Sequence, residues 1–231
     1  MLKLHQFPSV WGRNISPFTL KVETWLKIAG LPYEAVATVN PGRGPKGKVP
    51  FIEDEDGTRV GDSSLIVEHL ERTRRLDLSA GLSAAERAQA LAIQRLFEDH
   101  FYFIGVWSRW IDPDGWRMTA PGLFGSLPPG ARQLVPALVR RKMRRDLIGQ
   151  GLGRHSQAEQ YAMGRADLAA VSTLLGERAF FFADRPTTTD AIAYGFLANL
   201  LLVPVETQLK RIGQSFPNLV AWTQAMDRRF G

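Results

Sequence analysis

The sequence of 231 residues contains no cysteine. Disulfide bonds, zinc sites built on thiolates and cysteine nucleophiles are therefore all excluded. Histidine is also scarce, and the chain has four: His5, His69, His100 and His155. No two of them have the spacing of metal ligands. We therefore expect no metal site formed by this chain.

Long apolar runs are absent as well. No segment approaches the roughly 20 apolar residues that a membrane-spanning helix requires. The chain begins with an alternating strand pattern rather than with a charged and then apolar targeting segment. Hydrophobic residues make up 45% of the chain and charged residues 23%, which is typical of a soluble globular protein. We therefore expect a cytoplasmic location and no stable membrane insertion.

Acidic residues are fewer than basic ones, which gives a formal charge of +6. The densest basic run is "RRKMRRD", residues 140–146. Apolar residues recur around it at helical spacing, which predicts an amphipathic helix with the charges on one solvated face: Leu134, Val135, Leu138, Val139 and Leu147. A surface that attracts an acidic substrate or membrane headgroups is the alternative. No nucleic-acid-binding motif accompanies the run, so nucleic acid is not an expected partner.

Strand and helix patterns alternate up to about residue 78. Strands are predicted at residues 2–7, 33–38, 49–54 and 58–61, with Asp56-Gly57 as the hairpin turn between the last two. Helices are predicted at 17–29, where Gly30 ends the pattern, and at 63–71. A β-α-β unit followed by a hairpin and a helix is the thioredoxin arrangement.

Strand patterns disappear in the second half of the chain. A capping box at Ser83 and Glu86 opens a long helix that is predicted to run to about Trp110. Residues 113–130 are rich in glycine and proline and are predicted to form a loop. Further helices are predicted at 131–148, 156–176, 188–203 and 219–230. The predicted fold class is an α/β thioredoxin-like domain (residues 1–78) followed by an all-α domain (residues 83–231).

The start of the first predicted helix is the first candidate site. Ser16 and Thr19 bracket Pro17-Phe18 at a spacing where redox proteins often carry two cysteines. Serine before proline is a standard helix start, so Ser16 can serve simply as an N-cap. Alternatively, its hydroxyl contacts a ligand thiol at the helix N-terminus, where the dipole and a hydrogen bond both favour the thiolate.

Two further motifs suit a peptide-like ligand with an amino-acid end. A cis bond at Val49-Pro50 would let the backbone of Val49 pair with an extended ligand as an added strand does. Asp62-Ser63-Ser64 precedes a helix and suits an ordinary N-cap. The same N-terminus could also bind a carboxylate, and Asp62 an ammonium group.

A fourth motif, Thr187-x-x-Asp190, opens a strongly apolar segment. It is a capping box, and the backbone of the helix satisfies its polar groups. We interpret it as structural rather than catalytic.

Together these four motifs have the order and spacing of the glutathione transferase family, which the chain resembles over essentially its whole length. "SPFTLKVETWL", "GKVPFI", "DSSLIVEHL" and "GQGLGRHS" are more narrowly similar to one branch of the family. That branch contains the metaxins, the failed-axon-connections proteins and their bacterial relatives.

The resemblance implies a thioredoxin-like domain that binds glutathione and a helical domain that binds an electrophile. It implies that Val49 and a cis Pro50 hold the cysteinyl backbone of glutathione. Asp62 and Ser63 would hold its γ-glutamyl end, and Lys48 would meet its glycyl carboxylate.

The catalytic position implied by the resemblance is Ser16, which aligns with a cysteine in several relatives. Thr19 stands where this branch often has a cysteine, which argues against thiol–disulfide exchange. The implied reaction is therefore activation of the thiol of glutathione for attack on a small electrophile. Asn14 and Thr19 remain alternative contacts for that thiol. The expected substrate pocket contains two residues ahead of the first helix and two on the long helix: Trp11, Asn14, Tyr102 and Trp107.

Three other expectations concern the whole chain. The resemblance implies a homodimer. A binding or interaction protein that keeps the fold without turnover is the alternative function. Gly149, Gly151 and Gly153 follow no predicted strand, so we exclude a dinucleotide site and expect close backbone packing or a helix break.

Overall fold

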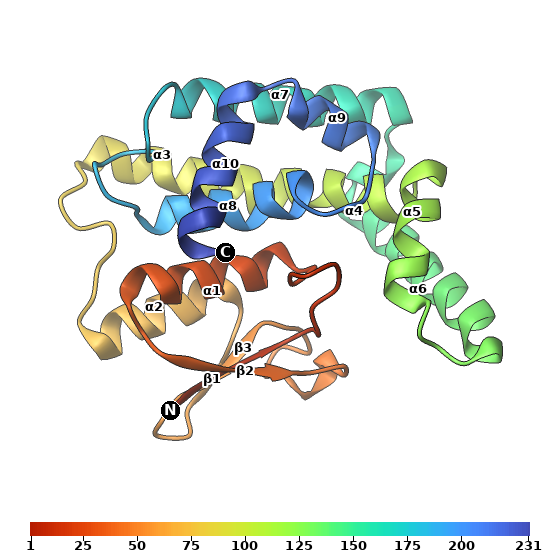
Figure 1. Ribbon diagram of the computed structural model, residues 1–231, viewed down its shortest axis with the longest axis horizontal. Helices are drawn as coiled ribbons and strands as arrows, with labels where there is room; N and C mark the ends of the chain where they lie inside the picture. The colour runs from red at the N-terminus through yellow and green to blue at the C-terminus, as the bar shows by residue number, and fades with distance from the viewer. The chain divides into compact units, whose positions relative to one another are not determined.

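The computed structural model describes residues 1–231, and four strands form its single mixed sheet in the order β2-β1-β3-β4 (Figure 1). The strands are β1 (Leu2–Gln6), β2 (Tyr33–Ala37), β3 (Phe51–Glu53) and β4 (Arg59–Gly61). β1 pairs parallel with β2, whereas β3 runs antiparallel to both β1 and β4. The four predicted strands are therefore confirmed.

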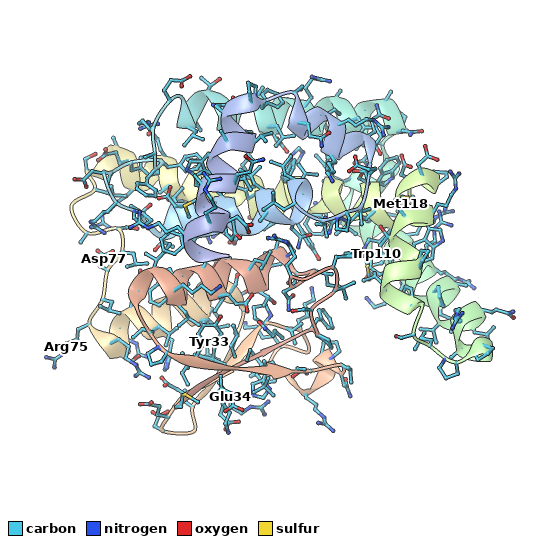
Figure 2. The ribbon with its side chains drawn as sticks, in the orientation of Figure 1. Tyr33, Glu34, Arg75, Asp77, Trp110 and Met118 are labelled. Atoms are coloured by element: carbon cyan, nitrogen blue, oxygen red, sulfur yellow. The ribbon has the colours of Figure 1, made fainter.

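Two helices, α1 (Pro17–Ala29) and α2 (Ser63–Arg74), cover one face of this sheet (Figure 1). Strand side chains alternate between the two faces, so Leu4 and Ile52 point into the core beneath the helices. The core contains apolar residues from strands and helices: Leu2, Leu4, Val22, Trp25, Leu26, Ile52, Ile66, Val67, Leu70 and Ala191. Tyr33 of the edge strand β2, labelled in Figure 2, lies below α1. Its hydroxyl donates a hydrogen bond to Glu23 of α1 at 3.4 Å.

The structure divides into two compact units. The first contains Met1–Gln94, Glu177–Asn199 and Ala221–Gly231, and the second contains Arg95–Gly176 and Leu200–Val220. The sheet, α1 and α2 lie in the first unit, together with most of α3 (Ala84–Arg95), α8 (Thr188–Leu201) and α10 (Pro217–Phe230). The predicted domain boundary between residues 78 and 83 stays a prediction.

Helix α8 packs closely on α1 within the first unit. A Cβ atom at Gly195 would lie 2.6 Å from the carbonyl oxygen of Pro17 and 2.8 Å from the backbone nitrogen of Lys21, so only glycine permits this approach. The start of α8 is fixed by Asp190, which accepts hydrogen bonds from the backbone and hydroxyl of Thr187 at 2.8 Å and from the backbone of Phe181 at 3.0 Å. The structural interpretation of the Thr187–Asp190 motif is confirmed.

The second unit is helical. It contains a π-helical segment η2 (Leu96–Phe101), α4 (Tyr102–Trp110), α5 (Pro113–Phe124), α6 (Pro129–Gln150), α7 (Gln157–Leu175) and α9 (Gln208–Gln214). The predicted long helix is therefore interrupted by a π-helical segment. Helix α9 was not predicted, although Thr207 caps it by accepting a hydrogen bond from the backbone of Lys210.

The prediction of a loop over residues 113–130 was wrong for α5, which begins at Pro113. Asp112 caps this helix by accepting from the backbone of Asp114 and Gly115, and proline suits the first helical position because its missing N–H needs no partner. A Cβ at Gly115 would lie 1.8 Å from the carbonyl oxygen of Ser108, so this glycine allows α5 to approach α4. The proline and glycine therefore start and pack a helix here. Trp110 of α4 packs its ring 5.7 Å from that of Trp116 in α5, and Figure 2 labels Trp110 and Met118 on these two helices.

The predicted amphipathic helix around the basic run is confirmed only in part. Arg141, Lys142, Arg144 and Arg145 of α6 are exposed as expected. Arg140 instead donates to the carbonyl oxygens of Trp110 and Ile111 at 2.8 and 3.0 Å. Two of the five predicted apolar members are exposed, Leu134 at 67% and Leu138 at 65%.

The glycine-rich segment ends α6 and begins a short 3₁₀ helix, η3 (Leu152–Arg154). Gly151 has a φ of 118°, and a Cβ at Gly153 would lie 2.6 Å from the carbonyl carbon of Leu147. The expected helix break and close backbone packing are both confirmed. No helix of the structure has the length and apolar character needed to cross a membrane, and no group of three or more potential ligands is placed to bind a metal.

We expect Gly195→Ala to lower the free energy of unfolding by about 1–3 kcal/mol, because the added methyl group overlaps the backbone of α1. At an unhindered helix position the same change stabilises by about 1 kcal/mol. Gly149→Ala in α6 is the control, since a Cβ there meets no atom within 4 Å. Urea unfolding measures both variants, and stabilisation of both would contradict the close approach of α8 to α1.

Candidate active site

Three of the predicted motifs meet at one edge of the sheet. β3 runs antiparallel to its neighbours, so His5 lies opposite Phe51 and Phe51 lies opposite Gly61. The end of β1, the start of β3 and the end of β4 therefore share that edge. The connections there lead to Ser16, carry Val49-Pro50 and lead to Asp62.

Ser16 is the N-cap of α1. Its side-chain oxygen accepts a hydrogen bond from the backbone of Thr19 at 3.3 Å, and Pro17 follows at the first helical position. The hydroxyl proton has no acceptor within the protein. Because Ser16 is partly exposed, it can cap the helix and donate a hydrogen bond to a ligand at the same time.

Asn14 and Thr19, the alternative thiol contacts, lie in the interior. Asn14 is 2% exposed, donates to the carbonyl oxygen of Phe7 at 2.6 Å and accepts from the backbone of Ser16 at 3.0 Å. Its amide therefore shapes the loop ahead of α1. Thr19 is fully buried, and its hydroxyl has no hydrogen-bond partner.

The loop ahead of α1 is held in place at several points. Val10 and Arg13 exchange two backbone hydrogen bonds, and the intervening Trp11 and Gly12 have φ values of 55° and 80°, which makes a tight turn. Tryptophan rarely adopts a positive φ, and such strain is concentrated at functional sites. Trp11 lies at the tip of this turn and is partly exposed. Its place in a substrate pocket stays a prediction.

The second motif contains the cis bond expected at Val49-Pro50. No hydrogen bond within the protein engages the backbone N–H or C=O of Val49. Gly47 precedes it with a φ of 66°, and Lys48 is exposed beside it. A free backbone donor and acceptor next to an exposed cation suit an extended ligand that carries a carboxylate.

The third motif begins α2. Asp62 is exposed, has a φ of 86°, and caps the helix by accepting from the backbone of Ser64 at 2.9 Å and of Leu65 at 3.3 Å. Ser63 is 4% exposed, and its oxygen accepts a hydrogen bond from the ammonium group of Lys21 at 3.2 Å.

Lys21 was missed by the sequence analysis. It is 1% exposed on α1 and also donates to the hydroxyl oxygen of Ser64 at 2.9 Å. The available signal was its position: Lys21 follows Phe18 by three residues and precedes Trp25 by four, so it interrupts an apolar stripe of the helix.

Tyr102 and Trp107, the predicted pocket residues of the second unit, both lie on α4. Trp107 is 8% exposed and packs edge-to-face against Tyr161 of α7, with ring centroids 5.6 Å apart. Tyr102 packs against the ring of Phe103 at 5.1 Å, and burial raises the pKa of its phenol. Their place in a substrate pocket stays a prediction.

A cavity of about 260 Å³ lies in the first unit. It is lined by His5, Phe51, Arg59 and residues of the segment 36–43, and it contains none of the predicted ligand-binding residues. Two of its lining residues, His5 and Phe51, nevertheless belong to the strands that end at the candidate site.

Comparison with known proteins identifies the family. The family model "Glutathione S-transferase N-terminal domain" matches residues 17–115, and "Glutathione S-transferase, C-terminal domain" matches residues 164–226. The isoprene-epoxide–glutathione S-transferase of Rhodococcus sp. (strain AD45) is 33% identical over 238 residues, which cover 100% of this chain and 99% of the relative. The chain belongs to the glutathione S-transferase family.

The branch predicted within this glutathione S-transferase family is also confirmed. Failed axon connections of Drosophila melanogaster is 33% identical over 81% of this chain and 47% of its own length. Metaxin-1 of Mus musculus is 27% identical over 83% of this chain and 62% of its own length. The chain thus spans only about half to two thirds of these two relatives.

A solved glutathione S-transferase confirms the predicted fold class. The enzyme from Methylobacterium radiotolerans, in complex with glutathione sulfonate, superimposes with a TM-score of 0.60 at 19% identity. The match covers 99% of this chain and 91% of that one.

The loop ahead of α1 depends on an acidic residue of α10. Asp227 accepts hydrogen bonds from Arg13 at 3.0 Å and from the hydroxyl of Tyr194 at 2.6 Å. Partial burial raises the pKa of Asp227, but these hydrogen bonds outweigh burial and hold it below its usual value. A lowered folded-state pKa adds stability above the unfolded-state pKa of about 3.9, and this stability is lost as the pH falls further.

We therefore expect Asp227→Asn to lower the free energy of unfolding by about 1 kcal/mol at pH 6. The deficit should shrink as the pH falls below about 4, because the native carboxylate then becomes protonated. Urea unfolding of the native protein and the variant at several pH values measures this. A deficit that is constant with pH would contradict a role for the charge of Asp227.

Proposed function

We propose that this protein is a glutathione-dependent transferase that activates the thiol of glutathione for attack on a small electrophile. The observation that carries the proposal is Ser16, whose oxygen caps α1 while its proton has no acceptor within the protein. The hydroxyl would donate that proton in a hydrogen bond to the glutathione sulfur. The N-terminus of α1 adds a positive dipole at the same point.

The two effects together favour the thiolate over the thiol. A free cysteine thiol has a pKa of about 8.5, and lowering it by two units requires about 2.7 kcal/mol of differential stabilisation. A hydrogen bond to a charged acceptor contributes about 1.5–3 kcal/mol, and a helix terminus about 0.3–1 kcal/mol. Ser16 and α1 can therefore supply a shift of this size.

The remaining motifs would orient the tripeptide. Val49 offers a free backbone N–H and C=O to the cysteinyl residue, and the exposed Lys48 suits the glycyl carboxylate. Asp62 is exposed beside Ser63 and suits the γ-glutamyl ammonium group. Two solved glutathione S-transferases of the same fold support this choice of co-substrate, because one holds glutathione and the other holds glutathione sulfonate.

A small epoxide is the first electrophile to test, because the relative from Rhodococcus is named for isoprene epoxide. The sulfur would form a bond to one epoxide carbon while the C–O bond breaks, and the resulting alkoxide would take a proton from solvent. The products are a thioether and an alcohol, and no oxidant or reductant is consumed.

The thiol pKa of bound glutathione tests the proposal. We expect ultraviolet titration of the thiolate to give a pKa clearly below about 8.5 in the native protein, and a value returning toward it in Ser16→Ala. Ser156→Ala is the matched control, because Ser156 is likewise an N-cap but belongs to α7. Both variants should lose about 1 kcal/mol of stability, whereas only Ser16→Ala should change the thiol.

Other outcomes would overturn the proposal in different ways. A lowered pKa that Ser16→Ala leaves unchanged would move the role to Asn14, Thr19 or the backbone. Absence of glutathione binding would favour a binding protein that keeps the fold for another partner.

A further inference from the structure

Lys21 lies directly behind the binding motif of α2. Its ammonium group is 3.2 Å from the hydroxyl oxygen of Ser63 and 2.9 Å from that of Ser64, so it joins α1 to the N-terminus of α2. Lys21 is 1% exposed and Ser63 is 4% exposed, whereas the neighbouring Asp62 is exposed. The lysine therefore lies too deep to bind a ligand itself, but it contacts Ser63, to which the family resemblance assigns the γ-glutamyl end of glutathione.

The direction of this hydrogen bond fixes the role of the serine. A lysine ammonium group has only donors, so the oxygen of Ser63 must accept from Lys21. The hydroxyl proton of Ser63 then has to point elsewhere, and no acceptor for it lies within the protein. Ser63 is thus prepared to donate a hydrogen bond to an acceptor that arrives with a ligand.

The charge of Lys21 also selects the kind of acceptor. A hydroxyl that accepts from a cation becomes a stronger donor, because consecutive hydrogen bonds polarise one another. Its best partner is an anionic oxygen, and the N-terminus of α2 favours negative charge at the same point. A carboxylate therefore suits this position better than a neutral carbonyl group.

We propose that Lys21 is a positioning residue that acts through Ser63 to bind the α-carboxylate of the γ-glutamyl group. This inference rests on the proposed function and deepens it. It assigns recognition of the amino-acid end to two charged residues of opposite sign: Asp62 attracts the ammonium group, and Lys21 orients and polarises the hydroxyl that binds the carboxylate.

Binding of two ligands to matched variants tests the proposal. The ligands are glutathione and 4-aminobutyryl-cysteinyl-glycine, which is glutathione without the α-carboxylate. We expect Lys21→Met to raise the dissociation constant of glutathione about tenfold and to leave that of the analogue unchanged. Lys21→Arg should restore much of the loss, and Lys3→Met, a partly exposed lysine of β1, should change neither constant.

A double-mutant cycle then distinguishes action through Ser63 from a general effect of charge. Ser63→Ala should show the same selective loss, and the double variant should bind glutathione little worse than Ser63→Ala alone. If the increases in the dissociation constant of the two single variants multiply in the double variant, action through Ser63 is overturned. Equal weakening of both ligands by Lys21→Met would show that the lysine is merely structural.

Two further results complete the test. If Lys21→Met does not fold, Lys21→Gln replaces it, because glutamine keeps a donor for Ser63 without the charge. We then expect a smaller loss of affinity, confined to glutathione. An unchanged preference for glutathione in Lys21→Gln would overturn the proposal. If the native protein binds neither ligand, the proposed function fails together with this inference, whereas native binding without selective loss in the variants overturns the role of Lys21 alone.

Discussion

The candidate site depends on the antiparallel insertion of β3 between β1 and β4. Each of β3 and β4 has only three residues, and their register aligns His5, Phe51 and Gly61 across the sheet. This pairing brings the connection after β1, the cis Val49-Pro50 bond and the start of α2 to one edge. A slip of one residue would reverse the faces of β3 and expose Ile52, so the core holds the register and thereby the site.

Two serine hydroxyls at this edge follow the same physical logic. The oxygen of each serine accepts a hydrogen bond from a donor within the protein. Ser16 accepts from the backbone of Thr19, and Ser63 accepts from the ammonium group of Lys21. Both protons are left for a ligand. In the proposed function the thiol arrives with the co-substrate, so a chain without cysteine needs no thiol of its own. Ser16 and Ser63 could be predicted because caps and motifs are local in sequence. Lys21 could not be assigned, because its partner lies 42 residues further along the chain.

The same distinction between local and distant causes explains the fold predictions. Elements with local signals were found, such as α1 between its serine cap and Gly30 and all four strands with their turns. Helix α5 was missed because glycine and proline can either interrupt a helix or start it and let it pack closely. At Gly115 the second applies because of the contact with α4, which the local sequence does not reveal. Arg140 was predicted to face solvent because its partners, two backbone carbonyl groups at the end of another helix, leave no signal in the sequence around it. The homodimer and the cytoplasmic location stay predictions.

Mapping glutathione onto the backbone by nuclear magnetic resonance tests the central claim most directly. In the ¹⁵N-labelled protein, the account predicts amide shifts at Ser16, Val49 and Ser63 that saturate with one common dissociation constant. Gly57, in the hairpin at the opposite end of β3 and β4, should not shift. Shifts confined to other parts of the chain, or no shifts at millimolar glutathione, would contradict the account.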